Sequence, residues 1–407
     1  MRPSLPLLLA SSAAALPWGG PHHHQTPMRV ELGPRPYYLV DNMDAGPLKD
    51  QLAACSEGPF HRSDFVFAHR GAPLQFPEHT REGYAAAARM GAGVIECDVT
   101  FTADKQLVCR HSMCDLHSTT DILTRPELAK KCTQGFTPAD NQRGIPASAN
   151  CCTADITLAE FESLCAKMDG VNLNATTLTE YLDGTPRFRT DLYATCGTLM
   201  THKAYIAMVD DLGLKFTSEA KLPAVPMPFN GYTQEQFLSD IIADYKAAGI
   251  DASRVWPQSF QFEDIAYWIK TAPDFAEQAL FLDPRVSTQE GYINATASLP
   301  GLAAQGLKIV APGFWALTQL DANKKIVPSA YAVAARKAGL DIVTWSFDRS
   351  GWLNKGGDSF YQPIHEVINN DGDMYTVLDV LVKQVGIKGL FTDWAATVVY
   401  YANCFGL

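Results

Sequence analysis

The sequence predicts an α/β fold, namely a TIM (β/α)8 barrel with a hairpin and a cysteine-rich insertion after the second strand. Short apolar runs bounded by polar turns recur along the chain, and helical segments fall between most of them. Eight such runs are present besides one that fits only a hairpin, and eight alternating strand and helix units are typical of a closed barrel. An open doubly wound sheet is the alternative, but no glycine-rich dinucleotide loop follows the first run.

The apolar runs define the expected strands and the segments between them the expected helices. Strands are expected over residues 65–68, 94–101, 214–221, 255–260, 280–283, 308–311, 342–347 and 389–392. Helices are expected over 80–90, 234–248, 262–271, 329–338 and 377–385. The extra run, Leu107–Arg110, follows the second strand after a short turn that leaves no room for a helix. It should therefore return antiparallel, as a hairpin arm.

Residues 112–200 form an irregular insertion, for which only two short helices are expected, at 158–165 and 178–182. The threonines before them, Thr157 and Thr177, are good helix caps. The insertion also holds six of the ten cysteines: Cys114, Cys132, Cys151, Cys152, Cys165 and Cys196. Cross-links would offset the entropy lost when a long loop is ordered, so we expect disulfide bonds there.

Cys97 and Cys109 lie within expected strands instead, and for them free buried thiols are the alternative to disulfides.

The chain begins with the pattern of an exported protein. Residues 1–15 combine an early arginine, a short apolar run and small residues, as in a signal peptide. Segment 16–60 is rich in proline and glycine, and we expect it to be solvated; no role is assigned to its three adjacent histidines, 22–24. The barrel domain should then span 61–407. Ten cysteines and the glycosylation sequons at Asn174 and Asn294 also fit a secretory route.

Composition excludes some partners. The net charge of −11 argues against nucleic acid, because phosphate backbones are bound by surplus lysine and arginine. The apolar stretch at residues 394–407 is short and lacks the spacer and tail of a lipid-anchor signal. We therefore expect a secreted protein without a stable membrane anchor, acting on a small molecule.

Three carboxylates form a candidate metal site. Glu96 and Asp98 are two residues apart in a strand, so their side chains share one face. Two adjacent carboxylates repel unless a cation neutralises them, and Glu219 in the next barrel strand adds a third. An all-oxygen ligand set suits Ca²⁺ or Mg²⁺. Lys221 shares a face with Glu219, and it could pair with a substrate phosphate or with one of the acids; a purely structural ion pair between the two is the plainer alternative.

Two histidines sit at strand ends beside these acids. His69 and His111 can take and give protons near neutral pH, which suits general base and general acid at a phosphorus centre. Arg70 offers a planar fork for phosphate oxygens. Among aromatic residues near strand ends, Trp345 is the one we expect to contact substrate, although inward barrel aromatics are as often core.

These residues resemble, in order, the motifs of the glycerophosphodiester phosphodiesterase family. The matching blocks are His69-Arg70-Gly71-Ala72, Pro77-Glu78-His79-Thr80, Glu96-x-Asp98, the strand ending in His111, Glu219-x-Lys221, Gln258-Ser259-Phe260, Trp345 and Gly389-Leu390-Phe391-Thr392-Asp393. With histidine at position 79, the second block resembles the periplasmic-type bacterial branch of the family more than the members that have asparagine there.

The resemblance implies metal-dependent hydrolysis of glycerophosphodiesters to an alcohol and glycerol 3-phosphate. It assigns His69 and His111 to acid and base, Arg70 and Lys221 to phosphate, and the three carboxylates to the metal. Members usually have aspartate after the second histidine, where this chain has Ser112, with Asp115 nearby. The insertion should sit over the barrel mouth and restrict the alcohol.

Two other functions are weighed against this one. A sphingomyelinase D-like enzyme, which forms a cyclic phosphate from choline lysolipids, has a similar arrangement, but Glu219 and the Pro-Glu-His-Thr block favour the hydrolase. A noncatalytic surface protein that keeps the barrel would be expected to have lost a histidine or an acid, and all of them are present.

Overall fold

The computed structural model describes residues 28–186, 189–190, 193 and 195–407. The expected signal peptide, 1–15, and the three histidines at 22–24 lie outside the described residues.

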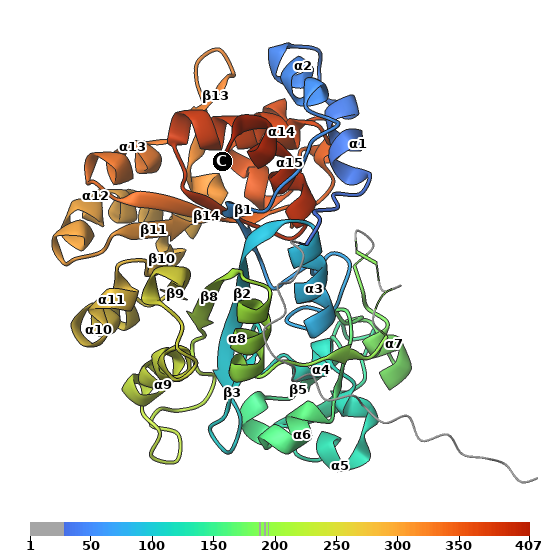
Figure 1. Cartoon of the computed structure of the whole chain (residues 1–407). Helices are drawn as coiled ribbons and strands as arrows, with labels where there is room; N and C mark the ends of the chain where they lie inside the picture. Colours follow the sequence, from blue (N-terminus) through green and yellow to red (C-terminus); the bar gives the residue numbers. More distant parts are fainter. Residues whose placement is uncertain (1–27, 187–188, 191–192, 194) are drawn as a thin grey trace, which may run out of the picture.

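Eight parallel strands close into the predicted barrel (Figure 1). They are β1 (Ser63–Ala68), β2 (Ala92–Phe101), β8 (Lys215–Ala220), β9 (Val255–Ser259), β10 (Leu280–Asp283), β11 (Ile309–Pro312), β14 (Asp341–Phe347) and β15 (Gly389–Thr392). β1 pairs with β15 on one side, where Phe67 is opposite Phe391, and with β2 on the other, where Phe67 is opposite Val94. Because the strand order runs from β1 through β15 round to β2, the pairing of β1 with β2 closes the sheet, and the open doubly wound alternative is wrong.

The extra run forms the predicted hairpin arm. β3 (Leu107–Cys109) pairs antiparallel with the end of β2, with Val99 opposite Cys109. This register brings the Cα atoms of Cys97 and Cys109 to 5.2 Å, within the range that a disulfide requires. The two cysteines are bonded, and the alternative of free thiols is wrong for them.

Helices cover the outside of the barrel. They are α3 (Arg81–Arg89), α8 (His202–Asp211), α9 (Gln234–Ala247), α10 (Phe262–Thr271), α11 (Pro273–Ala276), α12 (Gln289–Ala304), α13 (Ala330–Lys337), α14 (Asp373–Val380) and α15 (Ala395–Phe405). Sequence reasoning named none of α8, α11, α12 and α15. α12 contains Pro300, and α15 is buried along residues 395–402, so neither shows a clear one-sided apolar stripe.

The barrel holds two apolar layers. The larger fills the space between strands and helices, whereas a smaller one fills the barrel interior: Phe67, Val94, Leu280, Leu282, Ile309, Ala311, Val343 and Phe391. Leu282 and Phe391 also line a pocket among the polar residues that follow the strands. The barrel is thus a packed core with a site at its carboxyl end.

The insertion has a core of its own, which includes Ile122, Phe161 and Tyr181. Its elements are α4 (Leu116–Thr119), α5 (Pro126–Ala129), α6 (Leu158–Glu162), α7 (Leu178–Leu182), β4 (Gln134–Thr137), β5 (Ser148–Asn150), β6 (Cys165–Ala166) and β7 (Gly197–Thr198). Its six cysteines pair with one another, as Cys114–Cys152, Cys132–Cys151 and Cys165–Cys196, which confirms the expected cross-linking. In Figure 1 it lies beside α3, and Thr198 donates two hydrogen bonds to Glu82 of that helix.

The N-terminal segment is not simply solvated, contrary to the sequence-based expectation for 16–60. Residues 35–54 form α1 (Arg35–Asn42) and α2 (Pro47–Ala54), which lie against α14 and α15 in Figure 1. A disulfide joins Cys55 to Cys404, and Arg35 pairs with Asp348 at 2.9 Å. Composition missed these helices because their stability comes from contacts with the far end of the chain.

Arg35→Met should lower the free energy of unfolding by about 2 kcal/mol, because it leaves the fully buried Asp348 carboxylate without its cation. Denaturant unfolding would measure the loss. Arg143→Met is the matched control, since its pair with Asp140 is exposed, and it should change stability by less than ~0.5 kcal/mol. Equal effects of the two changes would show that the contact between α1 and the barrel does not contribute to the stability of the protein.

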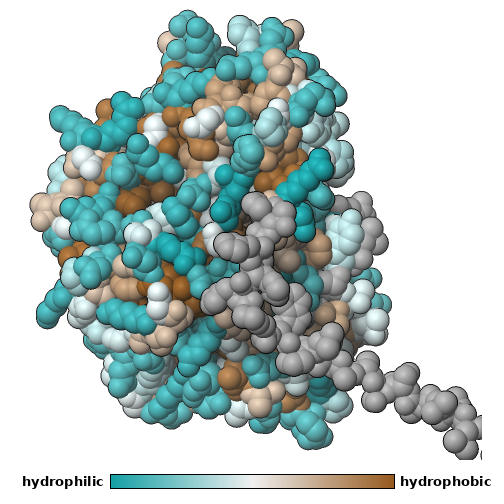
Figure 2. Space-filling model, in the orientation of Figure 1, coloured by the Kyte–Doolittle hydropathy of each residue, from teal (hydrophilic) through white to brown (hydrophobic). Residues whose placement is uncertain are grey.

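Hydrophilic side chains cover most of the face shown in Figure 2, with hydrophobic residues in separate patches between them. In the described part of the chain, no helix is long and apolar enough to cross a membrane.

Candidate active site

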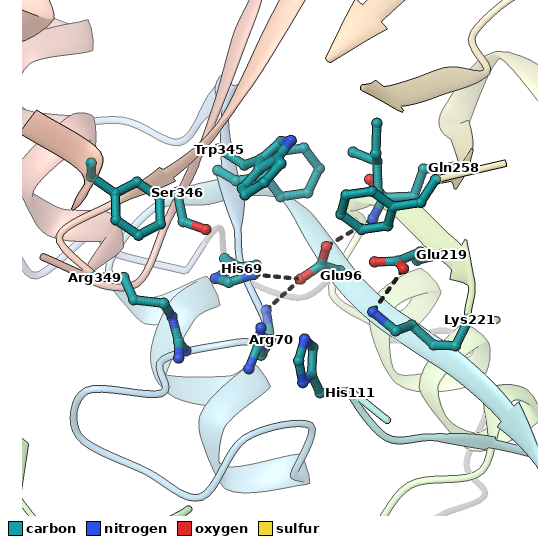
Figure 3. Close-up of a pocket in the computed structure, with 14 residues that line it drawn as sticks. His69, Arg70, Glu96, His111, Glu219, Lys221, Gln258, Trp345, Ser346 and Arg349 are labelled. Atoms are coloured by element: carbon teal, nitrogen blue, oxygen red, sulfur yellow. Dashed lines mark hydrogen bonds and ion pairs between the residues drawn. The ribbon is translucent and has the colours of Figure 1, made fainter. Parts of the chain in front are cut away.

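One pocket at the carboxyl end of the barrel gathers most of the residues singled out in the sequence (Figure 3). Its lining residues are His69, Arg70, Glu96, His111, Glu219, Lys221, Gln258, Phe260, Leu282, Trp345, Ser346, Arg349, Phe360 and Phe391. Seven of the eight predicted site residues are among them, and the eighth, Asp98, belongs to the carboxylate cluster beneath. None of the described residues of the insertion, 112–200, lines this pocket; His111, which does, comes directly before the insertion.

The turn after β1 aims His69 and Arg70. Arg70 has φ 56°, a conformation that side chains other than glycine adopt only at a cost, and its N–H donates to Glu96 Oε2 at 2.7 Å. Gly71 follows with φ 90°, and a Cβ there would lie 3.0 Å from the Gly83 carbonyl carbon in α3. The glycine is therefore required both by its backbone angle and by the close approach of the helix.

His69 is oriented by a carboxylate from the last barrel strand. Its Nδ1–H donates to Asp393 Oδ1 at 2.5 Å, and Nε2 lies 4.0 Å from Glu96 Oε2. The second oxygen of Asp393 pairs with Arg349 Nε at 2.6 Å. Burial lowers the pKa of His69 to about 4, although Asp393 acts to raise it. The imidazole is thus neutral near neutral pH, with Nε2 as its unprotonated nitrogen.

Glu96, Asp98 and Glu219 each place a carboxylate oxygen within 4.8 Å of the other two. Burial, and then the charge of Asp98, raises the pKa of Glu96 well above its usual range. Burial also raises the pKa of Glu219, to about 8. Burial acts to raise the pKa of Asp98 too, but Lys221 and His79 outweigh it and hold that pKa low. Two of the three carboxyl groups therefore resist ionisation in this buried cluster unless a cation neutralises their charge.

The donor set fits a divalent cation. Asp98 Oδ1 and Gln258 Oε1 are buried acceptors without a hydrogen-bond donor among the described residues, and both lie at this cluster. Gln258 Nε2 meanwhile donates to Glu96 Oε1 at 2.8 Å, which fixes that carboxylate. Buried acceptors without donors and three carboxylates are what an oxygen-preferring ion such as Ca²⁺ or Mg²⁺ would satisfy.

Lys221 pairs with Glu219 at 2.7 Å, which is the structural ion pair weighed in the sequence analysis. Its Nζ also lies 5.7 Å from the centre of the Phe260 ring. Because Lys221 lines the same pocket, the ion pair keeps its ammonium at the site.

The Pro-Glu-His-Thr block supports the site from behind. Glu78 pairs with Arg70 Nη1 at 3.0 Å and with the buried Arg110 Nη2 at 3.4 Å. His79 Nε2–H donates to Asp98 Oδ2 at 2.9 Å. Thr80 caps α3 by accepting from Gly83 N–H. Each residue of the block thus fixes a site residue or the helix behind it.

His111 has two carboxylates within 4.8 Å, those of Glu78 and Asp115. Asp115 accepts from the Ser112 N–H at 2.9 Å and lies 3.5 Å from Arg110 Nε, so its side chain turns back toward position 112. A carboxylate does lie near His111, although it comes from residue 115.

Aromatic side chains form one wall of the pocket. Trp345 donates from Nε1 to the Ala311 carbonyl at 2.8 Å, and its ring meets Phe260 and Trp315 edge to face. The wall is therefore held rigidly.

Sequence reasoning gave no role to four residues that the structure brings to the site: Glu78, Gln258, Arg349 and Asp393. Three of them lie in the motif blocks, so their positions were visible without their contacts. Arg349 belongs to no block, and only the fold reveals it.

The comparisons with known proteins agree with this geometry. The model of the glycerophosphoryl diester phosphodiesterase family matches residues 69–397. A protein of Arthroderma benhamiae named only as extracellular is 54% identical over 245 residues, covering 59% of this chain and 100% of that one. A glycerophosphodiester phosphodiesterase of Arabidopsis thaliana is 23% identical over 386 residues, covering 89% and 93%.

Among solved structures, a putative glycerophosphoryl diester phosphodiesterase from Silicibacter pomeroyi superposes with a TM-score of 0.55 at 20% identity, covering 86% of this chain and 95% of that one, which supports the barrel fold. The matched range includes His69, the three carboxylates and Asp393. The chain therefore belongs to the glycerophosphoryl diester phosphodiesterase family, whose members are phosphodiesterases.

Proposed function

We propose that the protein hydrolyses glycerophosphodiesters to an alcohol and glycerol 3-phosphate with the help of a bound divalent cation, Ca²⁺ or Mg²⁺. The observation that carries the proposal is the convergence of His69, His111, Arg70 and Lys221 on one pocket with the three-carboxylate cluster. The arrangement offers a base, an acid, cations for the phosphate and an oxygen-lined ion site, as phosphodiester hydrolysis requires.

His69 is the base in this proposal. Its Nδ1–H is committed to Asp393, so Nε2 can accept a proton from the attacking oxygen. That oxygen belongs to water, or to the 2-hydroxyl of the substrate, in which case water then opens the cyclic phosphate to glycerol 3-phosphate. Asp393 then stabilises the imidazolium that forms. His111 returns a proton to the departing alcohol oxygen. Burial lowers its pKa well below the usual value, with Arg70 and Lys221 adding to the effect, and the negative charge of a bound phosphodiester would raise it again.

Arg70, Lys221 and the ion site would hold the phosphate. Arg70 and Lys221 supply positive charge from separate strands, and the bound ion would neutralise charge that develops on the phosphoryl oxygens. Trp345 and Phe260 offer an apolar surface for the glycerol or the alcohol.

A chelator should abolish release of glycerol 3-phosphate from glycerophosphocholine, and added Ca²⁺ or Mg²⁺ should restore it. A coupled assay for glycerol 3-phosphate measures this directly. Unchanged turnover under full chelation would contradict the metal requirement. Phosphorus NMR of the products tests the sphingomyelinase D-like alternative, because a cyclic phosphate that persists would replace glycerol 3-phosphate.

Asp115→Asn should lower kcat about 10-fold, because it removes a carboxylate near His111. Adding Ser112→Asp to that variant should recover most of the loss by placing a carboxylate next to the histidine. Steady-state kinetics of the single and double variants measure both effects. A loss that Ser112→Asp does not reduce would mean that Asp115 supports the loop rather than His111.

Export and glycosylation are part of the proposal. Five disulfides and exposed asparagines at 174 and 294 support passage through an oxidising secretory route, and the Arthroderma relative carries an extracellular name. We also propose that the insertion limits the alcohol that reaches the pocket: none of its described residues lines the pocket, but its Arg189 is close enough for the charge of Arg349 to lower its pKa.

A further inference from the structure

Arg349 is a pocket residue that the assigned roles leave out. It follows β14 directly and lines the same pocket as His69 and Lys221. Figure 3 shows it on the far side of His69 from Lys221 and Glu219. A third cation, besides Arg70 and Lys221, thus lies on the side of the pocket opposite the carboxylate cluster.

The guanidinium has an unused donor. Its Nε forms an ion pair with Asp393 Oδ2 at 2.6 Å, and Nη2 is buried; neither nitrogen has a hydrogen bond of good geometry among the residues that the structure describes. A buried charged donor without a partner is costly, and an anion that enters the pocket would recover that cost.

The backbone holds Arg349 in place. The preceding Asp348 has φ 70°, and its carboxylate accepts from Thr392 Oγ1 at 2.5 Å, from Thr397 Oγ1 at 3.0 Å and from Arg35 Nη2 at 2.9 Å. The position of Arg349 is therefore set by α1, β15 and α15 before any ligand binds, and a preorganised donor costs little entropy on binding.

The local charge favours an anion on this side. Burial and then the charge of Arg349 lower the pKa of Arg189 to about 10, so this insertion residue, which pairs with Asp169, lies in the field of the same wall. Arg70 acts on Arg349 in the same way. Arg70, Arg189 and Arg349 thus gather on this side of the pocket, where the carboxylates of Asp393 and Glu78 also act on them.

We propose that Arg349 binds a phosphoryl oxygen of the substrate, opposite the ion site, so that the phosphate is held from two sides. The inference rests on the proposed function only in taking phosphate as the ligand. A phosphodiester has two non-bridging oxygens, and both gain charge as the phosphorus centre is attacked. One oxygen would lie toward the carboxylate cluster and Lys221, and the other toward Arg349.

The test is calorimetric binding of glycerol 3-phosphate and of inorganic phosphate to the whole protein, with Ca²⁺ present and after chelation. Arg349→Met should weaken binding of both anions about 10- to 100-fold, the effect expected for the loss of one charge-assisted hydrogen bond. Arg349→Lys, which keeps the charge and loses the fork, should fall between. Arg254→Met is the matched control, because Arg254 pairs with Asp210 before β9 at the other end of the barrel, and it should leave both affinities unchanged.

A double-mutant cycle separates substrate binding from mere support of Asp393. In an Asp393→Asn background, Arg349→Met should still weaken anion binding about 10-fold or more. If Arg349→Met lowers kcat but leaves both affinities within about twofold in either background, Arg349 only positions Asp393 and the inference is overturned. Wild-type protein that binds neither anion would overturn it as well. Arginine-dependent anion binding without hydrolysis of any glycerophosphodiester would support the inference and contradict the proposed function.

Discussion

Asp393→Asn should lower kcat about 10³- to 10⁴-fold while leaving the KM for the phosphodiester nearly unchanged. The asparagine can donate its own N–H to His69 Nδ1, which moves the imidazole proton to Nε2 and removes the base from the pocket. Asp393 is fully buried and contacts His69 at 2.5 Å, so water cannot replace it.

The same change has a defined effect on pH dependence. Activity that needs neutral His69 is lost as the pH falls through its pKa, which burial places at about 4. Asp393 acts to raise that pKa, so the Asn variant should keep its residual activity to lower pH than the wild type. Profiles of kcat/KM from acidic to neutral pH measure the shift. Asp379→Asn, whose partners Tyr401 and Lys383 lie outside the site, is the control. A loss below about 10-fold would contradict the base assignment, as would wild-type activity in His69→Ala.

Glu219→Gln should reduce metal-dependent turnover about 10²-fold or more and weaken Ca²⁺ binding by a similar factor. The variant keeps the volume of the side chain but removes one of three buried carboxylate charges. Glu235→Gln, an exposed position in the first turn of α9, is the matched control and should behave as wild type.

Thermal unfolding gives a readout that is independent of activity. An ion that binds only the folded protein stabilises it by about 2.7 kcal/mol at 100 times its dissociation constant. The wild-type melting temperature should therefore rise on addition of Ca²⁺, and that of Glu219→Gln should rise much less. Without metal the variant should be the more stable, since burial and the neighbouring Asp98 penalise the Glu219 charge and raise its pKa to about 8. Equal stabilisation of both proteins would place the ion elsewhere.

Periodicity predicted the barrel well, because each strand is a short buried run and most helices carry one apolar face. It failed where local patterns were weak. α15 is buried on nearly all sides and so shows no stripe, and α1 is held by Arg35, whose partner Asp348 lies 313 residues away. No local propensity encodes such a contact.

The candidate site, too, could be predicted from the sequence only in part. The spacing of Glu96 and Asp98 on one strand face, the histidines at strand ends and Glu219 with Lys221 could be predicted from alternation and motif order alone. The residues that contact them in the folded protein could not be predicted in this way. The cysteines of β2 and β3 became a disulfide only through the register of the hairpin, which no sequence pattern specifies.

The sequence by itself therefore determined the fold class and several of the polar groups that face the pocket, because side-chain alternation in a strand is a local property. Only the tertiary structure decided which groups act together. Closure of the barrel brings Asp393 to His69 across 324 residues, places Arg349 opposite the carboxylate cluster and returns Asp115 toward His111. The physical reason is that a charge pair or hydrogen bond depends on distances within a few ångströms, and those distances are set by packing of the whole chain.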